Sequence, residues 1–277
     1  MKKVLTIQDI SCVGKCSLTV ALPIISAMGV EAAILPTAVL STHTMFQNFV
    51  VEDLTHTVKP FSAHWKNENV EFEALYTGYL GSFEQIDLMK ELFDNFKTKN
   101  NFTFVDPAMA DNGRLYPAFD EKFAKYMATL CAKADIIVPN ITEACYMTGT
   151  EYKTEYDEAY IKDLLLKLNQ NGAPLCIITG VGFAPGKTGV MGYDSNTKEF
   201  YYYAHEKLPV SFHGTGDIFS STCLGALVRG YCWQEAVQIA ADFTAQCIRI
   251  TLDDPDKPWY GVNFEQAIPY LVKRLEK

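Results

Sequence analysis

The sequence predicts an α/β protein whose mostly parallel central sheet carries helices on both faces. Short apolar runs alternate with amphipathic stretches, which is the pattern of parallel strands joined by helical crossovers. The 277 residues, 48% of them hydrophobic, suffice for a substantial core. We find no internal repeat, low-complexity linker or shift in composition, so one domain over residues 1–277 is expected.

The expected elements follow one another in chain order. Each strand is a short apolar run bounded by turn residues, and each helix shows apolar residues at helical spacing. The strands are residues 4–8, 32–39, 74–77, 102–105, 136–138 and 175–179, and the helices are residues 18–28, 83–97, 119–132 and 161–169. Residues 189–203 break the alternation, because two apolar runs flank Asp194-Ser195-Asn196-Thr197, which predicts an antiparallel hairpin.

Polar residues gather where these strands end. In open α/β sheets, ligands bind beyond the carboxyl ends of the strands. The strand-end candidates are Asp9, Thr44, Tyr79, Asp106, Asn140, Glu143 and Thr179. Each residue alone also fits a turn or a helix cap, so their common position carries the functional prediction.

The segment His213-Gly214-Thr215-Gly216-Asp217 precedes a stretch with apolar residues at helical spacing. Two glycines allow a tight turn, and the N–H groups at a helix N-terminus attract anions, phosphate above all. Asp217 would repel a phosphate and therefore needs a separate explanation. It is either a base that takes a proton from an attacking hydroxyl or a helix cap.

Two further motifs have competing interpretations. Asn140-Ile141-Thr142-Glu143 fits a capping box, and it also fits a carboxylate that holds magnesium, usually through water. The glycine-rich residues 180–188 resemble a P-loop, but Val181 occupies the position of a required glycine. A hairpin strand rather than a helix follows, so we interpret this segment as a loop.

Charge and cysteine content narrow the class of protein. The net charge is −9 with no basic run, which argues against nucleic acid and anionic membranes as partners. The longest apolar run is too short to span a membrane, and the N-terminus is expected to be a strand. Eight dispersed cysteines without a CxxC motif indicate reduced thiols in a cytoplasmic protein, not a zinc site.

Several motifs, in order along the chain, resemble those of ribokinase-like small-molecule kinases and, within them, pyridoxal kinases. Ser41-Thr42-His43-Thr44 is similar to a Ser-Asn-His-Thr segment of pyridoxal kinases. Residues 78–85 are close to a stretch of the bacterial enzymes. The other matching segments are residues 4–8, Asp106-Pro107, residues 135–140, Asn140-x-x-Glu143 and Gly214-Thr215-Gly216-Asp217.

The resemblance implies ATP-dependent phosphorylation of the 5′-hydroxymethyl group of a B6 vitamer by a homodimer. Asp217 would be the base, and Gly214, Thr215 and Gly216 would form the anion hole. Asp106 and Glu143 would lie near Mg²⁺ and ATP, with a monovalent cation such as K⁺ as a further candidate. The remaining implied contacts are Asn140, Thr179 and Phe212 with the nucleotide, and Asp9, His43, Thr44 and Tyr79 with the vitamer.

The sequence departs from the resemblance at two positions. Pyridoxal kinases usually carry Ser-His where this chain has Asp9-Ile10, so recognition of the ring is expected to differ. Thr179 stands where many bacterial relatives carry a lysine. Two alternatives remain open, namely a hydroxymethylpyrimidine kinase of the same fold and a binding protein for a vitamer or nucleotide without catalysis.

Overall fold

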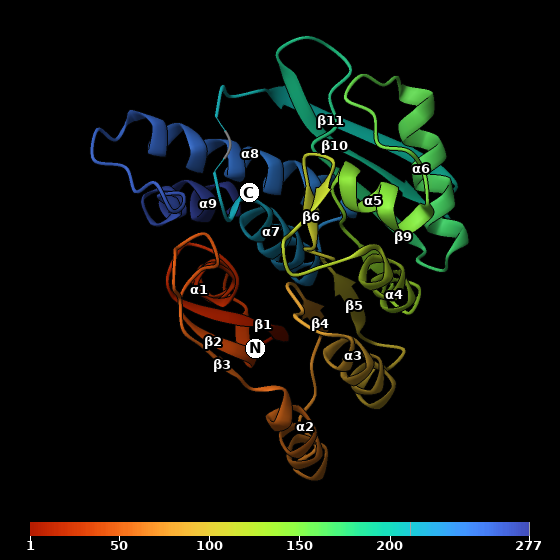
Figure 1. Cartoon of the computed structure of the whole chain (residues 1–277), viewed down its shortest axis with the longest axis vertical. Helices are drawn as coiled ribbons and strands as arrows, with labels where there is room; N and C mark the ends of the chain where they lie inside the picture. Colours follow the sequence, from red (N-terminus) through yellow and green to blue (C-terminus); the bar gives the residue numbers. More distant parts are fainter. Residues whose placement is uncertain (211, 277) are drawn as a thin grey trace. The chain divides into compact units, whose positions relative to one another are not determined.

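A computed structural model describes residues 1–210 and 212–276. The chain forms two compact units, each of which is described here by itself (Figure 1). The split unit comprises Met1–Ala74 and Lys207–Lys277, and the continuous unit comprises Leu75–Glu206. Within the described residues, no helix is long and apolar enough to cross a membrane.

The split unit begins with a parallel βαβ arrangement. Strands β1 (Lys3–Val13) and β2 (Glu31–Thr42) pair in parallel, and α1 (Leu18–Ala27) connects them. One face of α1 is buried against both strands through apolar residues such as Val20 and Ile24. A short strand, β3 (Val51–Asp53), pairs antiparallel with β2. The parallel pair and its crossover confirm the predicted beginning of the sheet.

The predicted strand ended at Gln8, which would place Asp9 after the strand. Asp9 instead lies within β1. The strand continues to Val13, and Asp9 lies where the register of β1 with β2 shifts, between Gln8, which is opposite Pro36, and Ile10, which is opposite Val39. Proline has no N–H to donate to a ladder, and extra residues in one strand produce such an irregularity. The polar residue that looked like a strand end therefore marks a shift in register within the strand.

Helices make up most of the rest of the split unit. Helix α7 packs against both α1 and α8, and the arginine that ends α7, Arg229, donates to the carbonyl oxygen of Met28. Of these helices, only the start of α7 was predicted. The helical elements are η1 (Thr55–Thr57), α2 (Val58–Asn67), α7 (Thr215–Arg229), α8 (Trp233–Asp253), η2 (Phe264–Ala267) and α9 (Ile268–Arg274).

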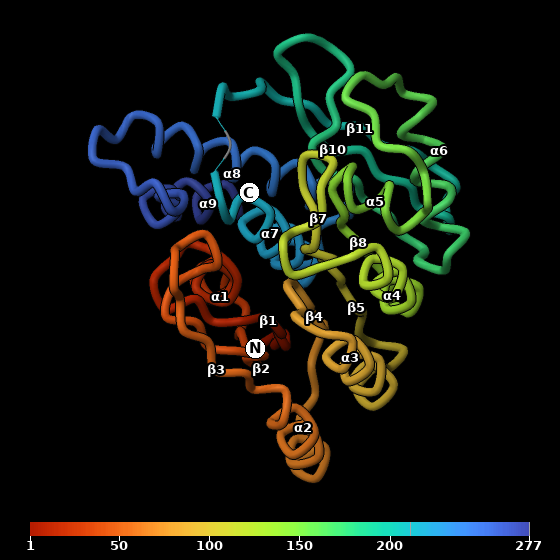
Figure 2. Tube along the Cα trace, viewed as in Figure 1, coloured from red at the N-terminus to blue at the C-terminus, as the bar shows by residue number. Residues whose placement is uncertain are grey.

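The continuous unit holds six neighbouring strands in the order β11-β10-β9-β8-β5-β4. Figure 2 shows the path of the chain through this unit. The pairs β5–β8 and β8–β9 are parallel, as the alternating pattern predicts. The strands are β4 (Ala74–Thr77), β5 (Phe102–Val105), β8 (Ile136–Ile137), β9 (Leu175–Thr179), β10 (Lys187–Asp194) and β11 (Glu199–Glu206), and β6 (Ala110–Asp111) and β7 (Arg114–Leu115) form a separate pair.

The predicted hairpin is confirmed. Strands β10 and β11 pair antiparallel from Lys187 opposite Glu206 to Asp194 opposite Glu199. Strand β10 also pairs antiparallel with β9. The glycine-rich loop before β10 leads into this hairpin and not into a helix, so the interpretation that it is not a P-loop is confirmed.

Four helices complete the continuous unit, each packed against the next along the chain. Ser82, Asp120 and Asp157 cap three of them, because each side chain accepts a hydrogen bond from a backbone N–H of the first turn. The predicted helix from residue 119 therefore begins two residues later, after its cap. The helices are α3 (Phe83–Phe96), α4 (Glu121–Cys131), α5 (Ile141–Thr148) and α6 (Glu158–Gln170).

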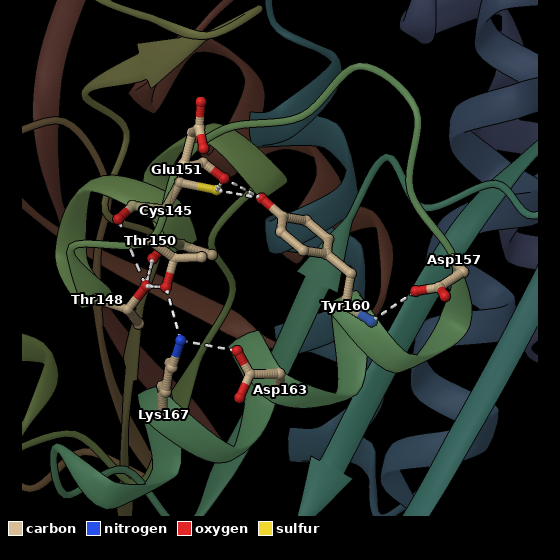
Figure 3. Close-up of polar contacts among 9 residues, drawn as sticks. Cys145, Thr148, Thr150, Glu151, Asp157, Tyr160, Asp163 and Lys167 are labelled. Carbon is tan, nitrogen blue, oxygen red and sulfur yellow. Dashed lines mark hydrogen bonds and ion pairs between the residues drawn. The ribbon is translucent and has the colours of Figure 1, made fainter.

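The end of α5 is tied to α6 by polar contacts (Figure 3). The Tyr160 hydroxyl donates to the carbonyl oxygen of Glu151 at 2.6 Å and lies 3.1 Å from the Cys145 Sγ. Lys167 donates to the Thr150 hydroxyl at 3.2 Å and pairs with Asp163. These contacts fix the C-terminal end of the helix that starts at Asn140.

All eight cysteines are free thiols. Cys12 and Cys232 are exposed, and the other six are buried. Burial raises the pKa of Cys176 and of Cys223 to about 12, so these thiols are protonated at neutral pH.

Candidate active site

In the continuous unit, the polar residues predicted at strand ends lie at the same edge of the sheet. Tyr79 follows β4, Asp106 follows β5, and Asn140 lies just beyond β8. The Asp106 N–H donates to the Thr77 carbonyl, and Asn140 pairs in parallel with Thr179, the last residue of β9. The strand order therefore brings together the four positions that the sequence pattern selected.

Glu143 completes a capping box at the start of α5. The Asn140 side chain accepts from the Glu143 N–H at 3.0 Å, and Glu143 Oε2 accepts from the Asn140 N–H at 2.8 Å. Oε1 accepts from Met109 N–H at 3.0 Å and from Ala110 N–H at 3.4 Å. The capping interpretation is thus confirmed, and both carboxylate oxygens bind backbone donors.

Asp106 and Glu143 form a buried acidic pair, 8% and 2% exposed. Burial, followed by the negative charge of Asp106, raises the pKa of Glu143 above its usual range, while three backbone N–H groups oppose the shift. Two neighbouring buried carboxylates favour binding of a cation or of a proton. Within the part of the chain that the structure describes, no group of three or more acidic, histidine or cysteine side chains could hold a metal ion.

In the split unit, Gly214 shapes the turn before α7. Its φ of 83° lies in the left-handed region, and a Cβ at this position would collide with the carbonyl oxygen of Lys15. Both conditions require glycine. The turn therefore lies directly against the loop that connects β1 to α1.

Asp217 is not the N-cap of α7. Gly214 occupies that position, so Thr215, Gly216 and Asp217 are the first three helical residues. A carboxylate in the first turn interacts favourably with the helix dipole. Asp217 is partly exposed and lies near the buried Cys16 thiol. Burial raises the pKa of Cys16 to about 12, and the negative charges of Asp217 and Asp9 add to this shift.

Asp9 is a second carboxylate near the same thiol. It is 5% exposed and accepts a hydrogen bond from the Ser11 hydroxyl at 3.1 Å and another from Ser17. Burial raises the pKa of Asp9, and the serine hydrogen bonds oppose the shift. Ser17 has a φ of 53°, a strained value for a residue other than glycine, and it is the N-cap of α1.

His43 is buried at the end of β2, with both ring nitrogens in hydrogen bonds. Its Nε2 lies 2.9 Å from the carbonyl oxygen of Tyr260, and its Nδ1 accepts from the Met45 N–H at 3.2 Å. The next residue, Thr44, is exposed. The ring of His213 lies 4.5 Å from that of His43, measured between centroids.

The other predicted residues have simpler surroundings. Tyr79 is partly exposed and its ring lies 5.5 Å from that of Phe119. Phe212 is partly buried, and its carbonyl oxygen accepts from the Thr215 hydroxyl at 3.2 Å. Sequence reasoning assigned no role to Ser11, Ser17 or Tyr260, because single serine and tyrosine residues give no local signal. Only their contacts in the fold identify them.

Comparison with known proteins assigns the chain to a family. Residues 21–257 match the model of the phosphomethylpyrimidine kinase family, and the chain belongs to that family. It is 27% identical over 241 residues to a pyridoxal kinase from Dictyostelium discoideum, covering 82% of this chain and 78% of the relative. The protein is therefore a phosphotransferase, and the resemblance to pyridoxal kinases that the motifs suggested is confirmed.

Solved structures agree over the whole length. A pyridoxal kinase from Lactobacillus plantarum is 29% identical, with a TM-score of 0.89, over 100% of this chain and 98% of that one. A protein from Bacteroides thetaiotaomicron, provisionally named a phosphomethylpyrimidine kinase and crystallised with pyridoxal, is 37% identical with a TM-score of 0.92. That match covers 98% of this chain and 95% of the other. The predicted ribokinase-like fold class is confirmed.

Proposed function

We propose that this protein transfers the γ-phosphoryl group of ATP to the 5′-hydroxymethyl group of a B6 vitamer. Membership of the kinase family supports phosphoryl transfer, and similarity to pyridoxal kinases supports a vitamer acceptor. The observation that carries the proposal is the position of Asp217 in the first turn of α7, where Gly214 and not Asp217 is the N-cap residue. A binding protein without catalysis would need no carboxylate among the anion-binding N–H groups.

Asp217 is proposed as the base. Its carboxylate accepts the proton of the vitamer hydroxyl while that oxygen forms a bond to the γ-phosphorus. The bond from the γ-phosphorus to the bridging oxygen breaks, and ADP leaves with the electron pair. The partial exposure of Asp217 is compatible with access of a substrate.

The N–H groups of Gly214, Thr215 and Gly216 are proposed to stabilise charge on the transferring phosphoryl group. They lie at the N-terminus of the 15-residue helix α7, where backbone N–H groups lack helical partners. The contact of Gly214 with Lys15 holds the turn in place, so little reorganisation is required during transfer. Phe212 is proposed to contact the adenine.

In the continuous unit, Asp106, Asn140 and Thr179 are proposed to contact the nucleotide. Their shared position at the ends of three neighbouring strands supports this assignment. The carboxylate of Asp106 fits a magnesium ion, which binds through one or two carboxylates, water and phosphate oxygens. Mg²⁺ would neutralise phosphate charge when bound with ATP. Glu143, whose oxygens accept three N–H groups, would act on the ion through water.

Asp9, Thr44 and Tyr79 are proposed to recognise the vitamer. A buried carboxylate with a raised pKa is stabilised by a cationic partner, and Asp9 meets that description. Pyridoxamine offers a primary ammonium, and a pyridine nitrogen can be held protonated. We therefore propose that pyridoxamine is used at least as well as pyridoxal.

A hydroxymethylpyrimidine is the second candidate acceptor. The name of the matching family favours it, as does the provisional name of the Bacteroides protein. Both acceptors are hydroxymethyl groups on nitrogen heterocycles, so the same base and anion hole would serve either. The proposal further includes a homodimer in the cytoplasm, with a monovalent cation such as K⁺ as an additional ligand.

The test is ATP consumption with pyridoxal, pyridoxamine, pyridoxine and hydroxymethylpyrimidine as separate acceptors. We expect the highest kcat/KM with a B6 vitamer and formation of the corresponding 5′-phosphate. A clear preference for hydroxymethylpyrimidine would favour the second candidate. Vitamer binding without turnover of ATP would indicate a binding protein.

A further inference from the structure

The ring of His43 lies among four segments of the split unit. The loop at Gly14 touches it, since a Cβ on Gly14 would lie 2.8 Å from the His43 Cδ2. Tyr260 and Met45 bind its two nitrogens, and His213 packs against its face. The ring is 4.9 Å from Phe46 and 6.1 Å from Trp259, between centroids.

The hydrogen bonds define one protonation state of His43. A carbonyl oxygen only accepts, so Nε2 must carry the hydrogen that is shared with Tyr260. A backbone N–H only donates, so Nδ1 must present its lone pair to Met45. This pairing places a hydrogen on Nε2, and both ring nitrogens are used within the protein.

His213 connects this ring to the proposed catalytic turn. It directly precedes Gly214, and its ring is tilted by 46° against that of His43. Burial, followed by the nearby His43, lowers the pKa of His213 to about 4, so the His213 ring is neutral at neutral pH. Lys15 contacts both segments: its carbonyl oxygen lies against Gly214, and its side chain lies against Gly261, the residue after Tyr260.

We propose that His43 is a positioning residue, which holds the turn at residues 214–217 through its contact with His213 and its hydrogen bond to Tyr260. This inference rests on the proposed function, because that turn is where phosphoryl transfer is assigned. It differs from the role implied by the resemblance, in which His43 contacts the vitamer. A small displacement of a catalytic group costs up to about 10²-fold in rate, so loss of the support should appear in kcat.

Two substitutions separate the nitrogens of the ring. In His43→Gln the amide nitrogen takes the place of Nε2 and retains the donor to Tyr260, whereas His43→Asn retains only an acceptor near Nδ1. We expect His43→Asn to lower kcat about 10–100-fold with little change in the KM for vitamer. We expect His43→Gln to retain kcat within about 3-fold. His64→Gln, on the exposed face of α2, is the matched control.

Three results would overturn the proposal. A rise in the vitamer KM that differs between pyridoxal and pyridoxamine would assign His43 to substrate binding. Equal losses of kcat in the Gln and Asn variants would show that the hydrogen bond to Tyr260 does not support the turn. If neither variant folds, the ¹⁵N spectrum of the wild-type imidazoles decides, because a hydrogen on Nδ1 of His43 contradicts the proposed support.

Failure of the proposed function is distinguishable from failure of this inference. If the wild-type protein phosphorylates no acceptor, the proposed function is wrong, and the catalytic part of this inference is wrong with it. If it does phosphorylate a vitamer and the two variants behave alike, only the role of His43 is wrong. The imidazole spectrum needs no activity and tests the packing in either case.

Discussion

At the scale of single residues, the role of Asp217 is the central question of the proposed mechanism. The sequence left a base and a helix cap as alternatives, and the structure gives the cap position to Gly214. Whether the Asp217 carboxylate acts as a base is a question that a conservative substitution can test.

Asp217→Asn should lower kcat by about 10²–10⁴-fold with an unchanged KM for ATP, because the amide has nearly the same shape but accepts no proton. The measurement is steady-state kinetics with the preferred vitamer, and exposed Asp256→Asn serves as the control. Turnover close to that of the wild type would exclude Asp217 as the base.

Asp9→Ser should shift preference from pyridoxamine towards pyridoxal. A charge-assisted contact in a partly desolvated pocket contributes roughly 1–3 kcal/mol, or about 5–150-fold in specificity. The ratio of kcat/KM for the two vitamers measures the effect in wild type and variant. If that ratio does not change, the carboxylate only holds Ser11 and Ser17, the two hydroxyls that it already binds.

At the scale of elements, helix starts carry most of the candidate site. The sequence pattern at residues 140–143 predicted the start of α5 because a capping box is local and is written in adjacent residues. The partners Met109 and Ala110 of Glu143 could not be predicted, since they are more than 30 residues away and carry no distinctive side chain. Local patterns therefore located the helix start, and the fold supplied the burial that changes its chemistry.

Glu143→Gln should lower the free energy of unfolding by roughly 1–3 kcal/mol, because an NH₂ group would face a backbone N–H. Chemical denaturation measures this, and Glu84→Gln in the exposed first turn of α3 is the control. The magnesium dependence of kcat should change less than stability does. A large increase in the magnesium requirement at unchanged stability would instead make Glu143 a participant in metal binding.

Gly214→Ala should destabilise the protein by at least about 2 kcal/mol and abolish turnover, because both the positive φ and the Lys15 carbonyl exclude a Cβ. Gly216→Ala is the matched control for stability, since a Cβ at position 216 would have no atom within 4 Å. Thermal unfolding of the two variants should therefore differ. Equal stabilities would mean that the turn tolerates a side chain at position 214.

At the scale of the whole molecule, the sequence predicted the alternation of strands and helices and the antiparallel hairpin. The sequence pattern did not predict α2, α8 and α9, because no apolar strand directly precedes these helices and marks where they begin. It also ended β1 too early, because Asp9, a polar residue at a register shift, looks like a residue after a strand. Single-sequence patterns record local periodicity, whereas bulges and pairings depend on the partner strand.

Stability should depend on pH through His213. Its pKa is lowered to about 4 in the folded chain from an ordinary 6.5, so the unfolded chain binds more protons between these values. The stability due to neutral His213 is complete above pH 6.5 and is lost as the pH falls towards 4. The contribution of His213 to the free energy of unfolding therefore falls by about 3 kcal/mol at most between neutral and acidic pH.

His213→Phe keeps a ring against His43 and removes the titration. Its unfolding free energy, measured at several pH values from 4 to 7.5, should fall less steeply with acid than that of the wild type. Comparison with the variant cancels the contributions of Asp9, Glu143 and the other carboxyl groups. Parallel curves would show that His213 keeps an ordinary pKa in the folded state.

The distribution of thiols gives each unit its own chemical reporter of transient opening. Cys131 and Cys176 lie buried in the continuous unit, and Cys223 and Cys247 lie buried in the split unit. With Cys12 and Cys232 replaced by serine, a thiol reagent should react only with molecules that have opened locally or globally. Reaction rates followed at each cysteine would then reveal whether the two units open together or one before the other, and whether bound nucleotide or vitamer slows one of them selectively.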